Sequence, residues 1–230
     1  MIRLPELAIM ADDLTGACDA AAAFAPSAGP VQVFIGPPRA SAMRGREKVL
    51  AVINTQSRLL QPRKSRNRVM RLARRLGSRP VLYMKMDSVL RGSAGAELEG
   101  LTRALPSRSL FLIPAVPEMG KTTKEGRLFE HGVPAHQTEY GKDPVSPLFT
   151  NDIRAIIGRT GSVNCQVVDA ETSEDIDRAV QGALRQPSVI LAGSVGLADA
   201  LARRLESTAG TVRRWLRSRA NMVGEPRGEP

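Results

Sequence analysis

Two neighbouring carboxylates, Asp12 and Asp13, directly follow an apolar run at Leu7–Met10 that is long enough to form a buried strand. In open α/β sheets ligands bind at the carboxyl ends of strands, so we expect both carboxylates to face solvent, a metal ion or a hydroxyl-rich ligand. Thr15 can cap the helical run that follows, and Gly16 lets a ligand approach the backbone closely. The alternative is that one Asp caps the helix and the other is a solvated turn residue.

A second candidate site lies in the segment KMDSVLRGSAGAE at Lys85–Glu97, where Asp87 ends another apolar run. Ser88 can start the next turn, and Arg91 follows Asp87 by four residues, so one helical turn would bring these two side chains together. An Arg beside the open backbone of Gly92 is suited to a bidentate grip on a carboxylate or a phosphate, while Asp87 can accept hydrogen bonds from sugar hydroxyls. The alternative is a structural Asp–Arg pair that closes a loop.

The segment AVPEMGKTT at 115–123 approximates a phosphate-binding loop, with Ala115 in the place of the first Gly, followed by Gly120, Lys121 and Thr122. The prolines at 114 and 117 lack the N–H donors that such a loop supplies, and the KEGRLFEHGVP that follows is typical of a turn and hairpin rather than a helix. A P-loop ATPase is therefore only an alternative. An anion can still bind to Lys121, Thr122 and Thr123.

The segment GSVG, which contains Gly193, Ser194 and Gly196, lies between an apolar run and a helical pattern. Backbone N–H groups at such a helix start can hold an anion, which makes these three residues candidates for cofactor binding. A tight turn is an equally good explanation.

His131 and His136 share an irregular segment with Glu139 and Asp143. Two imidazoles and two carboxylates could hold a metal ion, but their spacing matches no standard site. We therefore interpret these four as surface polar residues and predict no metal site.

Apolar runs that alternate with helical patterns must position these groups. The predicted strands are 7–10, 31–35, 50–54, 81–86, 110–113, 165–168 and 189–192. Beyond the Ala-rich helix after Asp13, the predicted helices are 66–77, 93–105, 148–158, 173–185 and 196–206. This order predicts an α/β fold with three layers, in which helices cover both faces of a mostly parallel central sheet. Residues 114–147 lack clear periodicity, and such a stretch in a compact domain is usually functional.

The chain has 230 residues, of which 42% are hydrophobic, so one large domain with a proper core is expected. We predict that residues 1–206 form this domain and that the basic segment 207–230 is a frayed tail. Two distant cysteines, Cys18 and Cys165, form neither a disulfide framework nor a zinc cluster and fit a reducing cytoplasm. No secretory signal is recognisable, and the longest uncharged run, 20–38, contains prolines and a glycine, so no membrane span is expected.

The net charge is +10, and nine Lys and Arg residues lie from Arg58 to Arg79 with no acidic residue among them. Val69, Leu72 and Leu76 mark an apolar stripe through the same segment, so we interpret the cations as the solvated outer face of a helix. Aromatic residues make up 3% of the chain, too few for base-stacking platforms. A nucleic-acid-binding protein that uses this basic face is an alternative, although nucleic acid is not the partner that we expect.

Five motifs follow one another in the chain: ADDLTGACDAA at 11–21, KMDSVLRGSAGAEL at 85–98, PAVPEMGKTTKEG at 114–126, HGVPAHQTEYGKDPVSP at 131–147 and LAGSVGLADALA at 191–202. In this order they resemble the amino-terminal half of the four-carbon acid sugar kinases, over about residues 7–205. Enzymes of this family phosphorylate threonate, erythronate and 3-oxo-tetronate-type acids with ATP. The ADD-x-TGA and DS-x-LRG elements are the most specific part of the resemblance.

The resemblance implies that this half binds the acid sugar and that a second, carboxyl-terminal domain supplies most of the ATP site. It implies a substrate site lined by Asp12, Asp13, Asp87, Ser88, Arg91 and Gly92, with Gly120, Lys121, Thr122 and Thr123 nearby. We assign catalysis to the three aspartates, one of which can act as base, and substrate binding to Thr15 and the other residues of this set. ATP and Mg²⁺ are the implied cofactors.

The chain departs from the family pattern in several places. Val89 stands where Thr is frequent, Ser93 where Asn is usual, and Glu118–Met119 precede Gly-Lys where Gly-Arg is common. The chain also stops soon after GSVGLA, so we expect the nucleotide domain to be absent. Phosphoryl transfer needs the nucleotide in line with the attacking hydroxyl, so acid sugar binding is expected here, with catalysis dependent on a separate nucleotide-binding domain or chain. A homodimer stays open.

Overall fold

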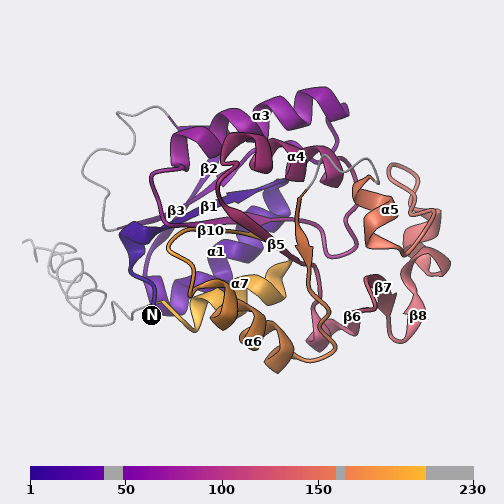
Figure 1. Ribbon diagram of the computed structural model, residues 1–230. Helices are drawn as coiled ribbons and strands as arrows, with labels where there is room; N and C mark the ends of the chain where they lie inside the picture. The colour runs from indigo at the N-terminus through magenta and orange to yellow at the C-terminus, as the bar shows by residue number, and fades with distance from the viewer. Residues whose placement is uncertain (39–48, 159–163, 206–230) are drawn as a thin grey trace, which may run out of the picture.

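The computed structural model describes residues 1–38, 49–158 and 164–205. Its main element is a parallel sheet of seven strands in the order β2-β3-β1-β4-β10-β5-β9 (Figure 1). The strands are β1 (Leu7–Ala11), β2 (Val31–Ile35), β3 (Leu50–Asn54), β4 (Val81–Lys85), β5 (Ser109–Ile113), β9 (Gln166–Val167) and β10 (Val189–Gly193).

Helices cover both faces of this sheet (Figure 1). One face carries α1 (Leu14–Ala28), α6 (Ser173–Ala183) and α7 (Val195–Ala202), and the other carries α3 (Pro62–Leu76), α4 (Ala94–Ala104) and α5 (Ile153–Ile157). Because side chains alternate along a strand, Ile9 and Tyr83 contact the first set of helices, whereas Met10 and Met84 contact the second. The expected three-layer α/β fold is therefore confirmed.

The central strands β1, β4 and β10 are buried at every position. A parallel sheet that is covered on both faces needs continuous apolar strands, which explains runs such as LAIMA and VILAG. Lys85, at the last position of β4, breaks this pattern and is 5% exposed.

β1 and β4 pair along their whole length, from Leu7↔Val81 to Ala11↔Lys85. β3 lies on the other side of β1, and β10 lies on the other side of β4. Since all four strands run parallel, the segments that follow them meet at one edge of the sheet. Asp12 and Asp87, which follow β1 and β4, therefore lie at the same edge of the sheet.

The stretch 114–147 contains a second, antiparallel sheet of β6 (Lys121–Lys124), β7 (Arg127–Glu130) and β8 (Val133–Pro134). Glu125 and Gly126 connect β6 to β7 with positive φ angles of 50° and 68°, as a tight hairpin turn requires. The predicted hairpin is therefore confirmed. The alternative of a phosphate-binding loop at 115–123 does not fit the structure, because a strand begins at Lys121 where such a loop continues into a helix. The 3₁₀ turns are η1 (Leu4–Glu6), η2 (Pro117–Met119), η3 (Ala135–Gln137) and η4 (Glu139–Lys142).

The helix expected at 148–158 is shorter than predicted and comprises only α5. Asp152 caps it by accepting a hydrogen bond from the backbone N–H of Ala155 at 3.0 Å, and Gly158, with a φ of 96°, ends it. The predicted tail, 207–230, lies outside the described residues. Among the helices of the described part, none is long and apolar enough to cross a membrane.

Candidate functional site

A polar cleft of about 180 Å³ lies at the edge of the sheet where β1, β3, β4 and β10 end. Four of its lining side chains are cationic, namely Arg58, Lys85, Arg91 and Lys121. Three are carboxylates, namely Asp13, Asp19 and Asp87. The ADDLTG and DS-x-LRG segments therefore meet in one place, as their positions after neighbouring strands predict.

Asp12 directly follows β1 and is held by Arg58, which lies between β3 and α3. Arg58 donates from Nε to Asp12 Oδ2 at 2.7 Å and from Nη2 to Asp12 Oδ1 at 2.9 Å. Its Nη1 donates to Asp13 Oδ2 at 2.5 Å. The backbone N–H groups of Ser57 and Arg58 also donate to the carbonyl oxygen of Asp12, at 2.8 and 3.2 Å. One guanidinium thus ties both carboxylates to the turn after β3.

Asp12 does not face solvent or a ligand as expected, because Arg58 supplies its counter-charge inside the protein. Burial raises the pKa of Asp12, while the hydrogen bonds and charge of Arg58 oppose that shift. The cap of α1 agrees with the alternative in which an Asp caps this helix: Asp13, not Thr15, is the cap, and its Oδ1 accepts from the N–H of Gly16 at 2.7 Å. Thr15 instead lines the cleft from the first turn of α1.

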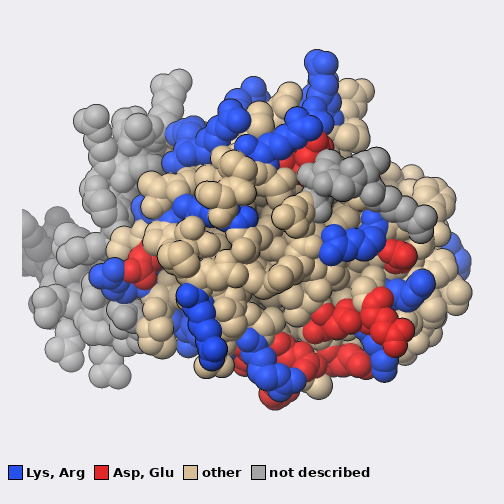
Figure 2. Space-filling model, in the orientation of Figure 1, with Lys and Arg blue, Asp and Glu red and all other residues tan. Residues whose placement is uncertain are grey.

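Arg58 corrects the interpretation of the basic segment 58–79. Its side chain is 16% exposed and belongs to the cleft rather than to an outer helix face. The helix begins only at Pro62, and its own cations, such as Arg63 and Arg71, are exposed as predicted; Figure 2 shows basic side chains over α3. The signal that could have identified Arg58 is its position shortly after the carboxyl end of a strand.

Asp87 and Arg91 form the second charged cluster of the cleft. Arg91 donates to Asp87 from Nε at 3.2 Å and from Nη2 at 2.7 Å. Its Nη1 donates to Asp143 Oδ2 at 2.8 Å, which gives Asp143 a structural partner that its spacing did not reveal. The turn expected to join Asp87 to Arg91 is confirmed, and Leu90 within it has a positive φ of 60°.

The charges around Asp87 keep it ionised. Burial acts to raise the pKa of Asp87, but the hydrogen bonds and charge of Arg91, with the charge of Arg58, outweigh burial and lower it. Arg58 Nη1 lies 3.9 Å from Asp87 Oδ2, so Arg58 links the two clusters. The pKa of Arg91 is raised in turn by its hydrogen bonds to Asp87. Asp87 is therefore an acceptor at neutral pH.

Tyr140, which we did not single out from the sequence, holds two cations at one end of the cleft. The guanidinium carbon of Arg91 and the Nζ of Lys121 each lie 5.3 Å from the centre of its ring. Both distances are within the range of cation–π attraction. An anionic group entering here would meet two positive charges.

Lys85 and Asp19 line the cleft, although the sequence analysis did not assign them to it. Lys85 donates from Nζ to the carbonyl oxygen of Met86 at 3.1 Å. A lysine at the end of an otherwise apolar strand was the available signal, because lysine is rarely buried without a partner or a function. Asp19 follows Thr15 by one helical turn, so helix periodicity could have found it.

Within the segment around Gly120, Lys121 reaches the cleft, whereas Thr122 and Thr123 are absent from its described lining. Thr123 is fully buried in β6, and its N–H donates to the carbonyl oxygen of Ala170 at 3.0 Å. Gly120 has a φ of 69°, and a Cβ there would lie 2.3 Å from the ring of His131. The structure thus places these three residues beside the cleft rather than in it.

In the GSVG segment, Ser194 lines the cleft, but its hydroxyl donates to the carbonyl oxygen of Ala115 at 2.7 Å. A Cβ on Gly193 would lie 1.9 Å from the carbonyl oxygen of Ile113, and one on Gly196 would lie 2.7 Å from that of Ala115. These glycines therefore allow close backbone packing between β10, α7 and the end of β5.

Ser88 lines the cleft, and Gly92 directly follows Arg91 in the sequence. The N–H of Gly92 donates to Ser146 Oγ at 2.7 Å. Gly92 has a φ of 79°, and a Cβ there would lie 2.3 Å from the carbonyl oxygen of Arg58. The glycine therefore lets the DS-x-LRG turn approach the turn that carries Arg58.

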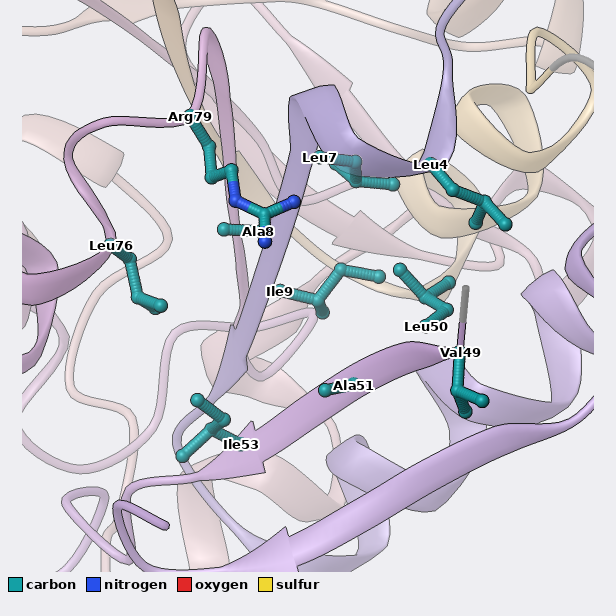
Figure 3. A pocket seen from close by; sticks show the side chains of 10 residues that line it. All are labelled: Leu4, Leu7, Ala8, Ile9, Val49, Leu50, Ala51, Ile53, Leu76 and Arg79. Atoms are coloured by element: carbon teal, nitrogen blue, oxygen red, sulfur yellow. The ribbon is translucent and has the colours of Figure 1, made fainter. Parts of the chain in front are cut away.

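A second pocket, of about 270 Å³, lies between β1 and β3 away from this edge (Figure 3). The ladder between these strands begins at Ile9↔Val52, and the residues before it line the pocket, namely Leu7, Ala8, Leu50 and Ala51. The charged residue of its described lining is Arg79, whose Nη1 donates to the carbonyl oxygen of Pro5. A pocket of this kind has few groups to orient a polar ligand, so we place the candidate site in the polar cleft.

Two curated relatives show what this chain is similar to. The D-threonate kinase of Salmonella typhimurium is 29% identical over 227 residues, which covers 85% of this chain and 53% of that protein. The D-erythronate kinase of Heliobacterium modesticaldum is 32% identical over 157 residues, which covers 67% of this chain and 36% of that protein. The chain therefore spans about half the length, or less, of these relatives.

A solved structure supports the fold. A domain of unknown function from Bordetella bronchiseptica, described with bound citrate and as a domain-swapped dimer, has a TM-score of 0.78 and 27% identity. The match covers 86% of this chain and 57% of that one. Residues 7–166, more than half of the chain, match the family model described as a sugar-binding N-terminal domain. The chain belongs to this family of sugar-binding N-terminal domains.

Proposed function

We propose that this chain binds a four-carbon acid sugar of the threonate, erythronate or 3-oxo-tetronate class in the polar cleft, for phosphorylation by ATP. The observation that carries the proposal is the meeting of four cationic side chains and three carboxylates in one cleft of about 180 Å³. A hydroxylated carboxylate needs both, because cations hold its carboxylate and acceptors hold its hydroxyls. The relatives named D-threonate and D-erythronate kinase support this class, and citrate, bound in the similar structure, is also a hydroxylated carboxylate.

Arg91 and Lys121 are the groups that we assign to the substrate carboxylate. Arg91 is already oriented by Asp87 and Asp143, which take three of its five guanidinium N–H groups, and among the described residues the other two are left to donate to a ligand. Lys121 lies against the same Tyr140 ring, so the two charges act together. A carboxylate between them would gain two charge-assisted contacts from groups that are positioned before it binds.

Asp87 and Asp13 are the groups that we assign to the substrate hydroxyls. The lowered pKa of Asp87 makes it a good acceptor but a weak base, so it orients a hydroxyl. Asp12 lies behind Arg58 and outside the described lining, so its role is to hold Arg58 in place. Asp13 lines the cleft and is therefore the better candidate for the base.

The polar cleft itself is a poor fit for a nucleotide. The cleft is smaller than the range of about 300–1,000 Å³ typical of pockets for drug-sized ligands. The carboxylates Asp12, Asp13 and Asp87 are already paired with arginines. The Ser194 hydroxyl already donates to the carbonyl oxygen of Ala115. Among the described residues no group of three or more His, Cys, Asp or Glu side chains is arranged to hold a metal ion. We therefore propose that ATP and Mg²⁺ are held by another domain or chain.

Titration calorimetry of the 230-residue chain with D-threonate, D-erythronate and citrate tests this proposal. We expect saturable binding with a stoichiometry of about one, because we assign the acid sugar to the one cleft in which cations and carboxylates converge. Binding should be weakened in Arg91→Ala and unchanged in Arg103→Ala, whose Arg pairs with a Glu four residues away on the outside of α4. No saturable binding of any of the three acids would overturn the proposal. Salt-sensitive retention on DNA would instead favour the basic face of α3.

A further inference from the structure

Glu97 is a carboxyl group that the proposed ligand contacts leave unused. It lies on α4, is 0% exposed, and points toward the turn after β3. Its Oε1 lies 2.5 Å from Ser57 Oγ and 3.5 Å from Ser65 Oγ. Its Oε2 is buried without a hydrogen-bond partner among the described residues. An ionised carboxylate is costly in such a place, so its protonation state has to be explained.

The hydrogen atoms of a four-membered chain determine that state. Thr55 Oγ1 lies 2.7 Å from the carbonyl oxygen of Ala11, which can only accept, so Thr55 donates its one hydroxyl proton there. Ser57 Oγ lies 2.6 Å from Thr55 Oγ1, so Ser57 must donate its own proton to Thr55. No hydroxyl proton is then left on Ser57 for the contact with Glu97. The contact becomes a hydrogen bond only if Glu97 is the donor.

We propose that Glu97 is held as a neutral carboxylic acid and is a positioning residue for Arg58, the guanidinium that links both charged clusters of the cleft. Ser57, which accepts the hydrogen bond from the Glu97 carboxylic acid, directly precedes Arg58 in the sequence. Their two backbone N–H groups donate to the carbonyl oxygen of Asp12. The chain from Glu97 through Ser57 and Thr55 to Ala11 thus joins α4 to the end of β1 and fixes the turn from which Arg58 extends.

The surrounding charges support the neutral form. Two charged groups face Glu97, namely Asp12 from the end of β1 and Arg58 from the turn after β3, while α3 presents the Ser65 hydroxyl. Burial raises the pKa of Glu97 to about 8, and the negative charge of Asp12 acts in the same direction. The charge of Arg58 and the Ser65 hydroxyl oppose the shift. Ionisation would set a second negative charge against Asp12 in competition for Arg58.

The first test follows the proton directly in the unmodified chain. Carbon-13 labelling of the Glu side-chain carboxyls gives one NMR signal per Glu, and we expect one of them to titrate near the raised pKa of about 8. The signal should disappear in Glu97→Gln and persist in Glu99→Gln, a control two residues along α4 that pairs with Arg66 and Arg103. If every Glu carboxyl titrates within about one unit of the ordinary value of about 4.3, the proposal is wrong.

The second test uses the linkage between protonation and folding. Since the pKa in the folded chain is raised, Glu97 supports folding fully below its ordinary value of 4.5 and loses that support as the pH rises to about 8. The folding constant of the wild type should fall by up to about tenfold per pH unit across this window. Glu97→Gln keeps an N–H for Ser57 and cannot ionise, so its urea unfolding midpoint should stay flat there. Parallel pH profiles for the two proteins would contradict the proposal.

The third test asks whether Glu97 acts through Arg58. The Nε–H NMR signal of Arg58, assigned by its loss in Arg58→Lys, should persist at about pH 6 and broaden by about pH 9 in the wild type, but persist throughout in Glu97→Gln. An Arg58 signal unaffected by pH in the wild type would overturn the positioning role.

The affinity readout rests on the proposed function. We expect D-threonate to bind about tenfold more weakly at pH 9 than at pH 6 in the wild type, and about equally at both in Glu97→Gln. Equal affinities at both values in the wild type would count against the positioning role. If D-threonate does not bind at all, the proposed function fails, while the proton titration and the Arg58 signal still decide the role of Glu97.

Discussion

At the scale of single residues, the cleft is held together by ion pairs that are largely removed from solvent. The side chains of Arg58 and Asp12 are 16% and 1% exposed, and they are joined by two hydrogen bonds. In such a pair the attraction between the two charges offsets the cost of removing them from water, so removal of one partner leaves a buried charge without compensation. The contribution of the pair to the free energy of unfolding is therefore measured by removing one partner.

Arg58→Ala should lower the free energy of unfolding by about 3–5 kcal/mol, since Asp12 would stay buried without its counter-charge. Arg63→Ala, on the exposed side of α3, should change it by less than about 0.5 kcal/mol. Urea unfolding monitored by circular dichroism gives both values. The double variant Asp12→Asn/Arg58→Ala should recover part of the loss, and a single variant as stable as Arg63→Ala would show that the pair is not structural.

Arg91→Ala should weaken acid sugar affinity by about 1.5–3 kcal/mol, the scale of a lost charge-assisted hydrogen bond. Arg91→Lys should recover only part of this, because an ammonium cannot reproduce the planar fork that holds Asp87 and Asp143. Calorimetry on variants whose folding has been verified measures both changes. Unchanged affinity in a folded Arg91→Ala protein would reduce Arg91 to a partner of Asp87.

The two charged clusters differed in how far the sequence could predict them. Arg91 follows Asp87 by four residues, so one local turn was enough to predict their contact. Arg58 and Asp12 are separated by 46 residues, and their contact depends on β3 lying beside β1. Strand order is set by tertiary packing rather than by local pattern. The local pattern therefore assigned Arg58 to the solvated face of the helix instead of the cleft.

At the scale of elements, apolar runs predicted the types and most of the bounds of the strands. β2 and β3 begin and end where predicted, because continuous apolar runs bounded by polar or turn residues are specific to buried strands. The helix at 148–158 was overestimated, since the apolar periodicity continued beyond what Asp152 and Gly158 allow. Caps and backbone angles, not periodicity, determined its ends.

Gly193→Ala tests whether the GSVG segment is a packing element. A Cβ there would lie 1.9 Å from the carbonyl oxygen of Ile113. The variant should therefore lose about 1–3 kcal/mol of folding free energy or more, as overpacked core positions do. Gly182→Ala, in α6, meets nothing within 4 Å and should stabilise the chain by up to about 1 kcal/mol. Thermal unfolding compares the two. A Gly193→Ala protein as stable as the wild type would refute the packing role and return this glycine to the ligand-binding candidates.

At the scale of the whole molecule, the charged groups of the candidate site collect at one edge of the sheet, while the apolar pocket of Figure 3 lies away from it. The fold therefore gathers the charged groups of both motifs in one polar cleft of about 180 Å³. On the proposed function, binding and chemistry are separable properties: we assign the first to these residues, and the second needs a nucleotide in line with the bound hydroxyl.

The chain alone should bind D-threonate but release ADP from ATP very slowly or not at all, because we assign the groups that position the nucleotide and stabilise the charge of the transferred group to another domain or chain. A coupled ADP-release assay with threonate, erythronate and their 3-oxo forms measures this. Addition of a separately expressed nucleotide-binding domain from a D-threonate kinase relative should raise the rate if the two parts dock. Robust turnover by the purified chain alone would show that a nucleotide site has been overlooked.

The position of β10 has a consequence for how this chain is made. β4 and β5 are successive strands of the large sheet in the sequence, yet β10, at Val189–Gly193, lies between them and pairs with both. A ribosome producing the chain from its amino terminus has released most of these residues before the middle strand exists. Until then β4 and β5 each present an unpaired edge, which other chains could join. The nascent chain therefore cannot complete the middle of its large sheet until synthesis reaches β10.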